Sequence, residues 1–316
     1  MPILRRLAAV VLGSATLLTF TQALAQAPAA EPSPAPGPTL AQVLAEAAAA
    51  DWRRPDPENT VYLDLDSGRV ILELAPDFAP LHAANIRTLV RAGYFDGLVI
   101  LRAQDNYVVQ WGDPKADDPA LARPLGNART SLPGEFDRSA ERLSFTRLTD
   151  GDVYAPEVGF SGGFPVGRDP TGQRAWLLHC YGALGVSRGN TADSGNGAGL
   201  YVVIGHAPRH LDRNITLAGR VLSGMEHLSV LPRGDGPLGF HSDPARHVPI
   251  RSLTLAAQLP VAEREPIEVL RTDTPTFQRL IEARRHRREP WFLDPVGRVE
   301  VCNIPIPVRR AEATAP

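Results

Sequence analysis

The sequence predicts a mainly β protein whose short strands form a closed barrel or a sandwich. The 316 residues include 30 prolines and 27 glycines, a composition that favours turns over long helices. Many short segments are apolar or alternate apolar with polar residues, whereas few have the spacing of an amphipathic helix. A chain of this length can form one large domain or two ordinary ones with a sizeable core.

Composition and charge describe a globular protein. Hydrophobic residues make up 43% of the chain, charged residues 22%, and the formal net charge is −2. No basic excess points to nucleic acid, and no segment after the N-terminal region has the apolar length of a membrane span. We therefore expect neither a nucleic-acid partner nor a membrane span.

The first 25 residues are typical of a secretory signal peptide. Arg5 and Arg6 give a positive start, residues 7–20 form an apolar run, and Ala-Leu-Ala at 23–25 supplies a small-residue cleavage site. We expect a mature protein that is periplasmic or secreted. The arginine pair leaves the choice between the general and the twin-arginine export route open. Residues 26–38 are rich in Pro and Ala and predict an extended linker.

Residues 39–58 predict an N-terminal helical arm, in which Thr39 caps a helix that ends near Asp51. A β-hairpin, a second helix and two more strands follow. The second helix begins at Pro80 and ends at Gly93, because proline suits a first helical turn and glycine a C-terminal stop. The strands predicted in this part of the chain are 61–66, 69–75, 98–102 and 107–112.

The middle of the chain is less regular. Residues 114–178 predict a loop-rich region with scattered strand-like pieces, and about 138–178 is interpreted as a long insertion. Further strands are expected at 182–187, 200–204 and 216–221.

Two local patterns match a hydrolase motif and a metal-binding pair, but the residues around them support neither function. Gly159–Gly163 matches G-x-S-x-G with Ser161 as the nucleophile, but that motif needs a strand before it and a helix after it. The neighbouring residues fit neither element, so a glycine-rich surface loop is favoured over a hydrolase. His206 and His210 flank a proline-containing segment that is not helical, so a metal site is not expected there.

Residues 259–316 predict a C-terminal extension, with a helix over 275–288 and a hairpin over 291–302. The arginine-rich end of the helix is interpreted as solvated surface. We expect a small α/β appendage that packs on the rest of the protein and buries Trp291 and Phe292.

The chain has only two cysteines, Cys180 and Cys302. In an oxidising compartment they can form a disulfide. They can equally remain buried and reduced, because sequence alone does not bring the two thiols together. Both alternatives stay open.

A series of motifs covers residues 59–221. The motifs are Gly68–Leu74 (GRVILEL), Ala79–Ile86 (APLHAANI), Gly93–Gly97 (GYFDG), Ile100–Pro114 (ILRAQDNYVVQWGDP), Gly182–Arg188 (GALGVSR), Asn196–Ile204 (NGAGLYVVI), His210–Asp212 (HLD) and Gly219–Val221 (GRV). In this order they resemble the cyclophilin family of peptidyl-prolyl isomerases, in a divergent bacterial form. The resemblance covers about half of the chain.

The resemblance implies a closed antiparallel β-barrel capped by two helices, over residues 59–258. It also implies an exported peptidyl-prolyl cis-trans isomerase that assists the folding of proline-containing unfolded or newly exported polypeptides. Neither a metal nor any other cofactor is expected, and the protein is expected to be a monomer.

By resemblance, Arg102 is the catalytic arginine and Gln110 orients both the substrate and the arginine. At the twisted transition state the amide loses its resonance, and the proline nitrogen becomes a better hydrogen-bond acceptor. A fixed guanidinium would therefore bind that state better than either planar isomer. The other implied substrate-binding residues are Tyr107, Val108, Tyr201, Leu211, Ser187 and Arg188.

The chain departs from the family pattern around this site. Leu101 stands where the family has a histidine, Gly199 where it has a substrate-binding glutamine, and Ile215 where it has a histidine or an aromatic residue. These departures keep an alternative open, a catalytically weak or inactive cyclophilin-like peptide-binding module or chaperone. The alternative role for Arg102 is an ion pair at a strand end.

Overall fold

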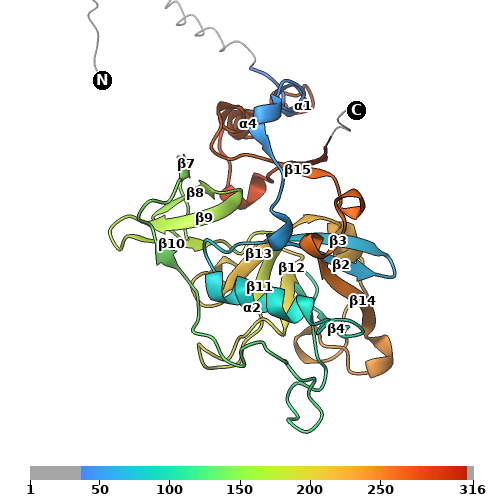
Figure 1. Ribbon diagram of the computed structural model, residues 1–316. Helices are drawn as coiled ribbons and strands as arrows, with labels where there is room; N and C mark the ends of the chain where they lie inside the picture. The colour runs from blue at the N-terminus through green and yellow to red at the C-terminus, as the bar shows by residue number, and fades with distance from the viewer. Residues whose placement is uncertain (1–36, 312–316) are drawn as a thin grey trace, which may run out of the picture. The chain divides into compact units, whose positions relative to one another are not determined.

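The computed structural model describes residues 37–311, so the predicted signal peptide and nearly all of the predicted linker lie outside the described residues. Its centre is a closed barrel of eight antiparallel strands, in the order β11-β12-β5-β4-β14-β2-β3-β13 (Figure 1). The predicted fold class is confirmed. The barrel strands are β2 (Thr60–Leu65), β3 (Gly68–Leu74), β4 (Val99–Ala103), β5 (Val108–Gly112), β11 (Ala183–Val186), β12 (Leu200–Val203), β13 (Leu217–Ser223) and β14 (Val248–Leu255).

Alternating apolar residues fill the barrel. In β2, Val61, Leu63 and Leu65 all belong to the barrel core, as the period of a strand requires. Helices α2 (Pro80–Arg91) and α3 (Met225–Ser229) add apolar side chains to the same core, and they are the two capping helices. No helix within residues 37–311 combines the length and the apolar character that crossing a membrane requires.

The barrel strand β14 has no counterpart among the predicted strands. Its register shifts between Ile250 and Ser252, and such a β-bulge interrupts the alternation from which strands are recognised. Pro249, a residue that is uncommon inside strands, also lies within it. β14 pairs with β2 and β4 and so closes the barrel.

The region predicted to be loop-rich contains a second sheet of five strands, which corrects that prediction (Figure 1). Two glycines inside its strands permit close packing. A Cβ atom on Gly159 would lie 2.2 Å from the Thr146 carbonyl oxygen, and one on Gly167 would lie 2.6 Å from the Trp176 ring. Glycine weakens the alternating pattern, so these strands are hard to recognise. They are β6 (Arg138–Ser139), β7 (Thr146–Leu148), β8 (Glu157–Ser161), β9 (Phe164–Asp169) and β10 (Arg174–Leu177).

Ser161 lies at the end of β8. Gly162 and Gly163 have φ angles of +58° and +89° and form the tight turn that leads into β9. A strand therefore follows the serine, where a nucleophile elbow would have a helix. The expected surface loop is instead the end of a hairpin, with Ser161 only 6% exposed.

The two ends of the described chain form one module. β1 (Trp52–Arg53) pairs with β15 (Ile267–Leu270), and β15 pairs with β16 (Val308–Arg310). α1 (Leu40–Ala45) packs beside α4 (Pro275–His286) (Figure 1). The N-terminal arm and the C-terminal extension thus share one sheet and one helix pair.

α1 is shorter than the predicted helix, although Thr39 caps it as expected. The Asp51 carboxylate accepts hydrogen bonds from the backbone N–H of Ala48, at 2.9 Å, and from the Thr276 hydroxyl, at 2.8 Å. These contacts stabilise a 3-10 turn over Ala49–Asp51, which replaces the last part of the predicted helix.

The predicted hairpin over 291–302 is wrong. Trp291 is 81% exposed, and Phe292 is only half-buried. The backbone N–H of Val299 donates to Asp150 Oδ1, at 3.1 Å, so this part of the extension is held by the insertion and does not pair with itself.

The extension is attached by a helix and by a disulfide. Phe277, Leu280 and Ile281 of α4 are fully buried in an apolar cluster that also contains outward-facing barrel side chains. Cys180 and Cys302 form a disulfide, with sulfur atoms 2.01 Å apart and Cα atoms 5.1 Å apart. The bond joins the chain just before β11 to the extension.

The disulfide gives a prediction for thiol reactivity and stability. Protein unfolded without reductant should have no reactive thiol, and reduction should release both. Replacing both cysteines with alanine should lower the free energy of unfolding by about 5 kcal/mol in the chain-entropy model, because the two half-cystines are 122 residues apart. Thiol titration and urea unfolding measure these quantities, and thiols that titrate before reduction would contradict the bond.

Asp150 gives a second prediction. The Arg285 guanidinium binds its carboxylate and holds the pKa of Asp150 below its usual range, despite burial. The stabilisation is therefore complete above the unfolded pKa of about 4 and is lost as the pH falls through the lower folded value. Asp150→Asn should cost about 1–3 kcal/mol of unfolding free energy at neutral pH.

The matched control for Asp150→Asn is Asp66→Asn, since the pair of Asp66 with Arg251 is largely exposed and contributes little. Urea unfolding should separate the two variants at neutral pH and bring them together at a pH below the folded pKa of Asp150, where its carboxyl group is protonated. Equal midpoints at neutral pH would show that Asp150 does not anchor the extension.

Candidate active site

Arg102 owes its position to a β-bulge in β4. In a regular strand, residues two positions apart face the same side. The register with β5 shifts between Ile100 and Arg102, so these two side chains face opposite sides. Ile100 and Ala103 are fully buried in the barrel core, whereas Arg102 is only partly buried. The bulge thus places the Arg102 guanidinium on the outer face of β4, whereas Ile100 and Ala103 of the same strand point into the barrel.

Three oxygens hold the Arg102 guanidinium. Nη1 donates to Gln110 Oε1 at 3.0 Å, and Nε donates to the Leu238 carbonyl oxygen at 2.7 Å. Nη2 donates to Gln104 Oε1. Burial lowers the pKa of Arg102, but an arginine stays protonated in a protein. The group is therefore a fixed cation, and further N–H bonds of its terminal nitrogens remain for another acceptor.

The Leu238 carbonyl is brought to Arg102 by the segment between α3 and β14. This segment lies along β4, where Gly234 N–H donates to the Ala103 carbonyl and His241 N–H donates to the Leu101 carbonyl. Leu238 itself has a φ of +56°, an uncommon conformation for leucine. The strained turn directs its carbonyl oxygen at the guanidinium.

An aromatic surface adjoins the guanidinium. Arg102 Cζ lies 5.6 Å from the centre of the Tyr107 ring and 5.3 Å from that of Phe240. Tyr107 is half-buried and packs on an apolar cluster that includes Val108 and Tyr201, both nearly fully buried. Tyr107 therefore presents the accessible ring, and the other two residues pack around it.

Strand register places the polar residues in one row. Arg102 pairs with Gln110 across β4 and β5, and Gln110 pairs with Tyr201 across β5 and β12. Since Gln110 Oε1 accepts from Arg102, its amide NH₂ is free to donate elsewhere. The sequence-predicted residues of these three strands are thus brought together.

A cavity of about 730 Å³ begins at Gln110. Ser187 and Arg188 line it, and the Ser187 hydroxyl is buried without a hydrogen-bond partner. Arg188 donates from Nε to the Asn214 carbonyl at 2.9 Å, which keeps its side chain along the wall. Gly199 adds no side chain to this wall, and a Cβ atom at its position would lie 3.3 Å from Ser187 Cβ.

The other predicted residues lie at the margins. Leu101 lines the same cavity, in place of the family's histidine. Leu211 is half-buried in a 3-10 helix after β12, and Ile215 packs on the cluster that contains Tyr201.

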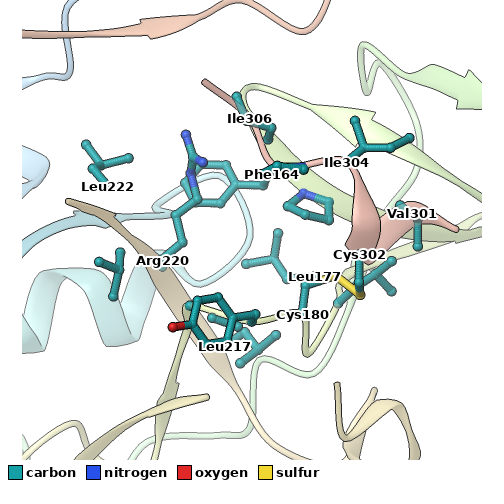
Figure 2. Close-up of a pocket in the computed structure, with 18 of the residues that line it drawn as sticks. Phe164, Leu177, Cys180, Leu217, Arg220, Leu222, Val301, Cys302, Ile304 and Ile306 are labelled. Carbon is teal, nitrogen blue, oxygen red and sulfur yellow. A yellow bond between two sulfur atoms is a disulfide. The ribbon is translucent and has the colours of Figure 1, made fainter. Parts of the chain in front are cut away.

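A second cavity, of about 230 Å³, lies beside the disulfide and shares no lining residue with the first (Figure 2). Its walls are mainly apolar. The exception is Arg220, whose guanidinium lies beside the Phe164 ring, with Cζ 5.5 Å from the ring centre. Burial lowers the pKa of Arg220 to about 10, so it stays charged at neutral pH. Tyr181 also contributes to the lining of this cavity.

Among residues 37–311, no group of three or more His, Cys, Asp or Glu side chains is arranged to hold a metal ion. His206 donates its backbone N–H to Asn106, which ties the loop after β12 to the turn between β4 and β5.

Sequence reasoning missed three residues that contact Arg102. Gln104 follows it by two positions and carries a suitable amide, so proximity is a signal for it. Leu238 acts through a backbone carbonyl, and no side-chain pattern identifies such a contact. Phe240 comes from a segment far along the chain, which only the fold brings near.

Comparisons with known proteins agree with the fold. The family described as cyclophilin type peptidyl-prolyl cis-trans isomerase/CLD matches residues 60–255. A probable peptidyl-prolyl cis-trans isomerase of Brucella suis is 29% identical over 57% of this chain and 74% of its own. A putative thylakoid lumen peptidyl-prolyl cis-trans isomerase of Synechocystis is 24% identical over 56% of this chain and 44% of its own.

Among solved structures, a cyclophilin from Hirschia baltica is similar to this chain, with a TM-score of 0.65 and 26% identity. The similarity covers 86% of this chain and 98% of that one, so it reaches beyond the barrel. The family match covers more than half of the chain and coincides with the eight barrel strands. On this evidence the chain belongs to the cyclophilin-type peptidyl-prolyl cis-trans isomerase family.

Proposed function

We propose that this protein catalyses the cis-trans isomerisation of X-Pro bonds in unfolded or newly exported polypeptides, with Arg102 as the catalytic group. The observation that carries the proposal is the fixed guanidinium beside an accessible aromatic ring. Arg102 donates to Gln110 and to the Leu238 carbonyl, and Tyr107 lies next to it. No covalent intermediate is needed for the reaction.

The chemistry follows from amide resonance. Rotation about a peptide bond faces a barrier of about 18–20 kcal/mol, because the twisted state loses that resonance. In the twisted state the proline nitrogen carries a lone pair that accepts a hydrogen bond. A remaining N–H of Arg102 would donate to it, and this contact is stronger in the transition state than in either planar isomer. The three existing contacts of Arg102 keep the guanidinium in place without reorganisation.

The surroundings of Arg102 suit an extended peptide. The Tyr107 ring would receive the pyrrolidine ring, with Val108 and Leu211 as neighbouring apolar contacts. The Gln110 amide would donate to a substrate carbonyl. The cavity beyond it, with Ser187 and Arg188 in its wall, has room for side chains that precede or follow the proline.

An extracytoplasmic location fits the chemistry of the chain. The N-terminal residues predict a signal peptide, and a disulfide such as that of Cys180 and Cys302 persists in oxidising compartments. One relative is named as a putative thylakoid lumen protein. We therefore propose that the protein acts as a monomer on exported chains in the periplasm or outside the cell.

Arg102→Ala tests the catalytic role. It should lower kcat/KM for a proline peptide by about 100-fold, the effect of removing one donor to a transition state, and change the Kd of the peptide far less. A protease-coupled isomerisation assay and isothermal titration calorimetry measure the two quantities. Arg102→Lys is the control, because an ammonium has only three donors and cannot bind the three oxygens and still donate to the proline nitrogen, so it should rescue little. Unchanged kcat/KM in a folded Arg102→Ala variant would make the arginine structural.

Tyr107→Ala tests the ring contact. It should weaken peptide binding by about tenfold, since it removes an aromatic surface worth roughly 1.5 kcal/mol, and change kcat less. Tyr107→Phe keeps the ring and should bind the peptide as the parent does. If the alanine variant binds as tightly as the phenylalanine variant, the proline ring does not rest on this residue.

A further inference from the structure

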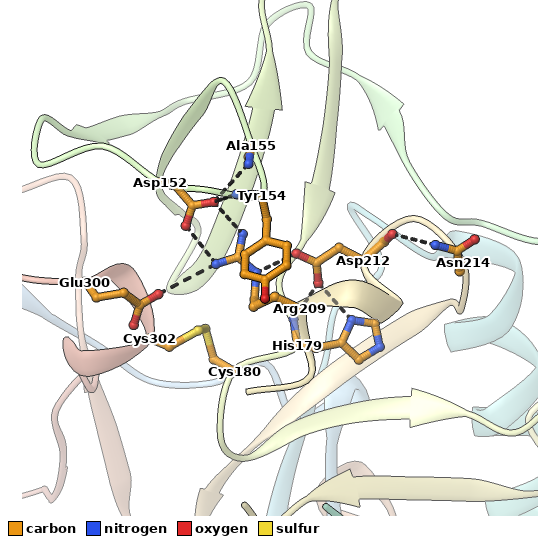
Figure 3. A network of polar contacts seen from close by, with 10 residues as sticks. All are labelled: Asp152, Tyr154, Ala155, His179, Cys180, Arg209, Asp212, Asn214, Glu300 and Cys302. Carbon is orange, nitrogen blue, oxygen red and sulfur yellow. Dashed lines mark hydrogen bonds and ion pairs between the residues drawn. A yellow bond between two sulfur atoms is a disulfide. The ribbon is translucent and has the colours of Figure 1, made fainter. Parts of the chain in front are cut away.

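A chain of buried polar side chains starts at Tyr201, beside the proposed site. Tyr201 Oη lies 2.9 Å from His179 Nε2, and His179 Nδ1 lies 2.9 Å from Asp212 Oδ1. Asp212 Oδ2 accepts from Arg209 Nε at 2.5 Å, and Arg209 binds Asp152 with both terminal nitrogens, at 2.9 and 3.0 Å. Figure 3 shows the part of this network from His179 to Asp152.

The network is almost entirely shielded from water. The side chains of His179, Asp212, Arg209 and Asp152 are at most 5% exposed. A buried polar group without a partner costs free energy, so each member depends on the next. Replacing a buried ion-pair network with apolar side chains is often neutral or stabilising, so stability alone is a weak explanation for this network.

Hydrogen-bond roles along the network can be assigned. Asp212 Oδ1 accepts a hydrogen bond from the backbone N–H of His179, at 3.0 Å. The same carboxylate oxygen is the acceptor toward Nδ1 of the His179 ring. In the neutral tautomer that donates from Nδ1 to Asp212, Nε2 is left as an acceptor. Burial raises the pKa of Tyr201, so its hydroxyl keeps its proton, and toward this tautomer of His179 it acts as the donor to Nε2.

The Tyr201 ring is held at two places. A Cβ atom on Gly185 would lie 2.1 Å from Tyr201 Cζ, so the ring lies directly on the backbone of β11. The hydrogen bond to His179 then fixes the far end of the ring. A phenylalanine at this place would keep the first constraint and lose the second.

The held ring is part of the proposed site. Tyr201 pairs with Gln110 in register, and it shares an apolar cluster with Val108, against which Tyr107 packs. The Arg102 charge lies near enough to act on the pKa of Tyr201. A shift of the Tyr201 ring would therefore disturb the surface that receives the proline.

We propose that His179, oriented by Asp212 and Arg209, is a positioning residue for the isomerase site, which it acts on by holding the Tyr201 ring in place. The inference rests on the proposed function. It also gives the insertion and the extension a role at the site, because Asp152 belongs to the insertion and Cys180, next to His179, is bonded to the extension.

A double-mutant cycle tests the proposal. His179→Leu and Tyr201→Phe should each raise KM for a proline peptide about tenfold, with a smaller change in kcat, because each removes the same hydrogen bond. The double variant should also show about a tenfold increase, not about 100-fold, since contacts that share one interaction are not additive. His179→Gln should restore most of the affinity, because its amide can accept from Tyr201 and donate to Asp212.

His82 supplies the matched control, because it is also a buried histidine paired with a carboxylate, with Nδ1 2.7 Å from Glu135 Oε2. His82→Leu combined with Tyr201→Phe should give independent, multiplying effects on KM. Thermal unfolding of every variant ensures that only folded proteins are compared, and His179→Gln keeps the test open if His179→Leu does not fold.

The outcomes separate this inference from the proposed function. Multiplying effects of His179→Leu and Tyr201→Phe, or an unchanged KM in Tyr201→Phe, would overturn the positioning role while leaving isomerase activity intact. If the parent protein binds the peptide without turning it over, the proposed catalysis fails, and the same cycle measured in Kd still decides the positioning role. If the parent protein binds no proline peptide at all, both are overturned.

Discussion

Closure of the barrel is the constraint on which the site depends. Every barrel strand has two hydrogen-bonded neighbours, so none can slip without breaking pairs on both sides. The register that follows puts Arg102, Gln110 and Tyr201 in one row across three strands. The bulge at Leu101 then turns Arg102 away from the core without interrupting the ladder for more than one residue. The relative positions of Arg102, Gln110 and Tyr201 are therefore set by the pairing of the backbone strands.

The layers outside the barrel act on the site through polar contacts. The segment between α3 and β14 supplies the carbonyl that binds Arg102, and the insertion supplies Asp152 to the network that ends at Tyr201. Both contacts act on residues of the barrel from its outside. The guanidinium of Arg102 is thus held without a contact from Leu101 or Gly199.

The sequence predicted the parts of the fold in which local pattern and tertiary structure agree. The hairpin of β2 and β3, the α2 helix and the pair of β4 and β5 have clean periodicity and clear stops, and the resemblance supplied their closure into a barrel. β14 was not predicted, because a bulge and Pro249 interrupt its alternation of apolar and polar residues. The second sheet was not predicted, because glycines stand in place of larger side chains where its strands pack closely. The predicted hairpin over 291–302 does not form, and the backbone N–H of Val299 donates instead to the carboxylate of Asp150, a residue distant in sequence. Arg102, Gln110 and Tyr107 could be named from their motif, but the Leu238 carbonyl has no sequence signal, because a backbone oxygen is present at every position.

The sheet that joins the two ends of the described chain has a consequence for the order of folding. A ribosome releases the N-terminal residues first, and β1 can pair only with β15, which lies more than 200 residues later in the chain. The last strand of the barrel in sequence is β14, so the barrel can close before β15 is available to pair with β1. Cys302 emerges later still, and its bond to Cys180 can form only after the extension has reached the barrel. Oxidation of this cysteine pair thus requires the chain to be made at least as far as residue 302, and the bond then holds the extension against the barrel.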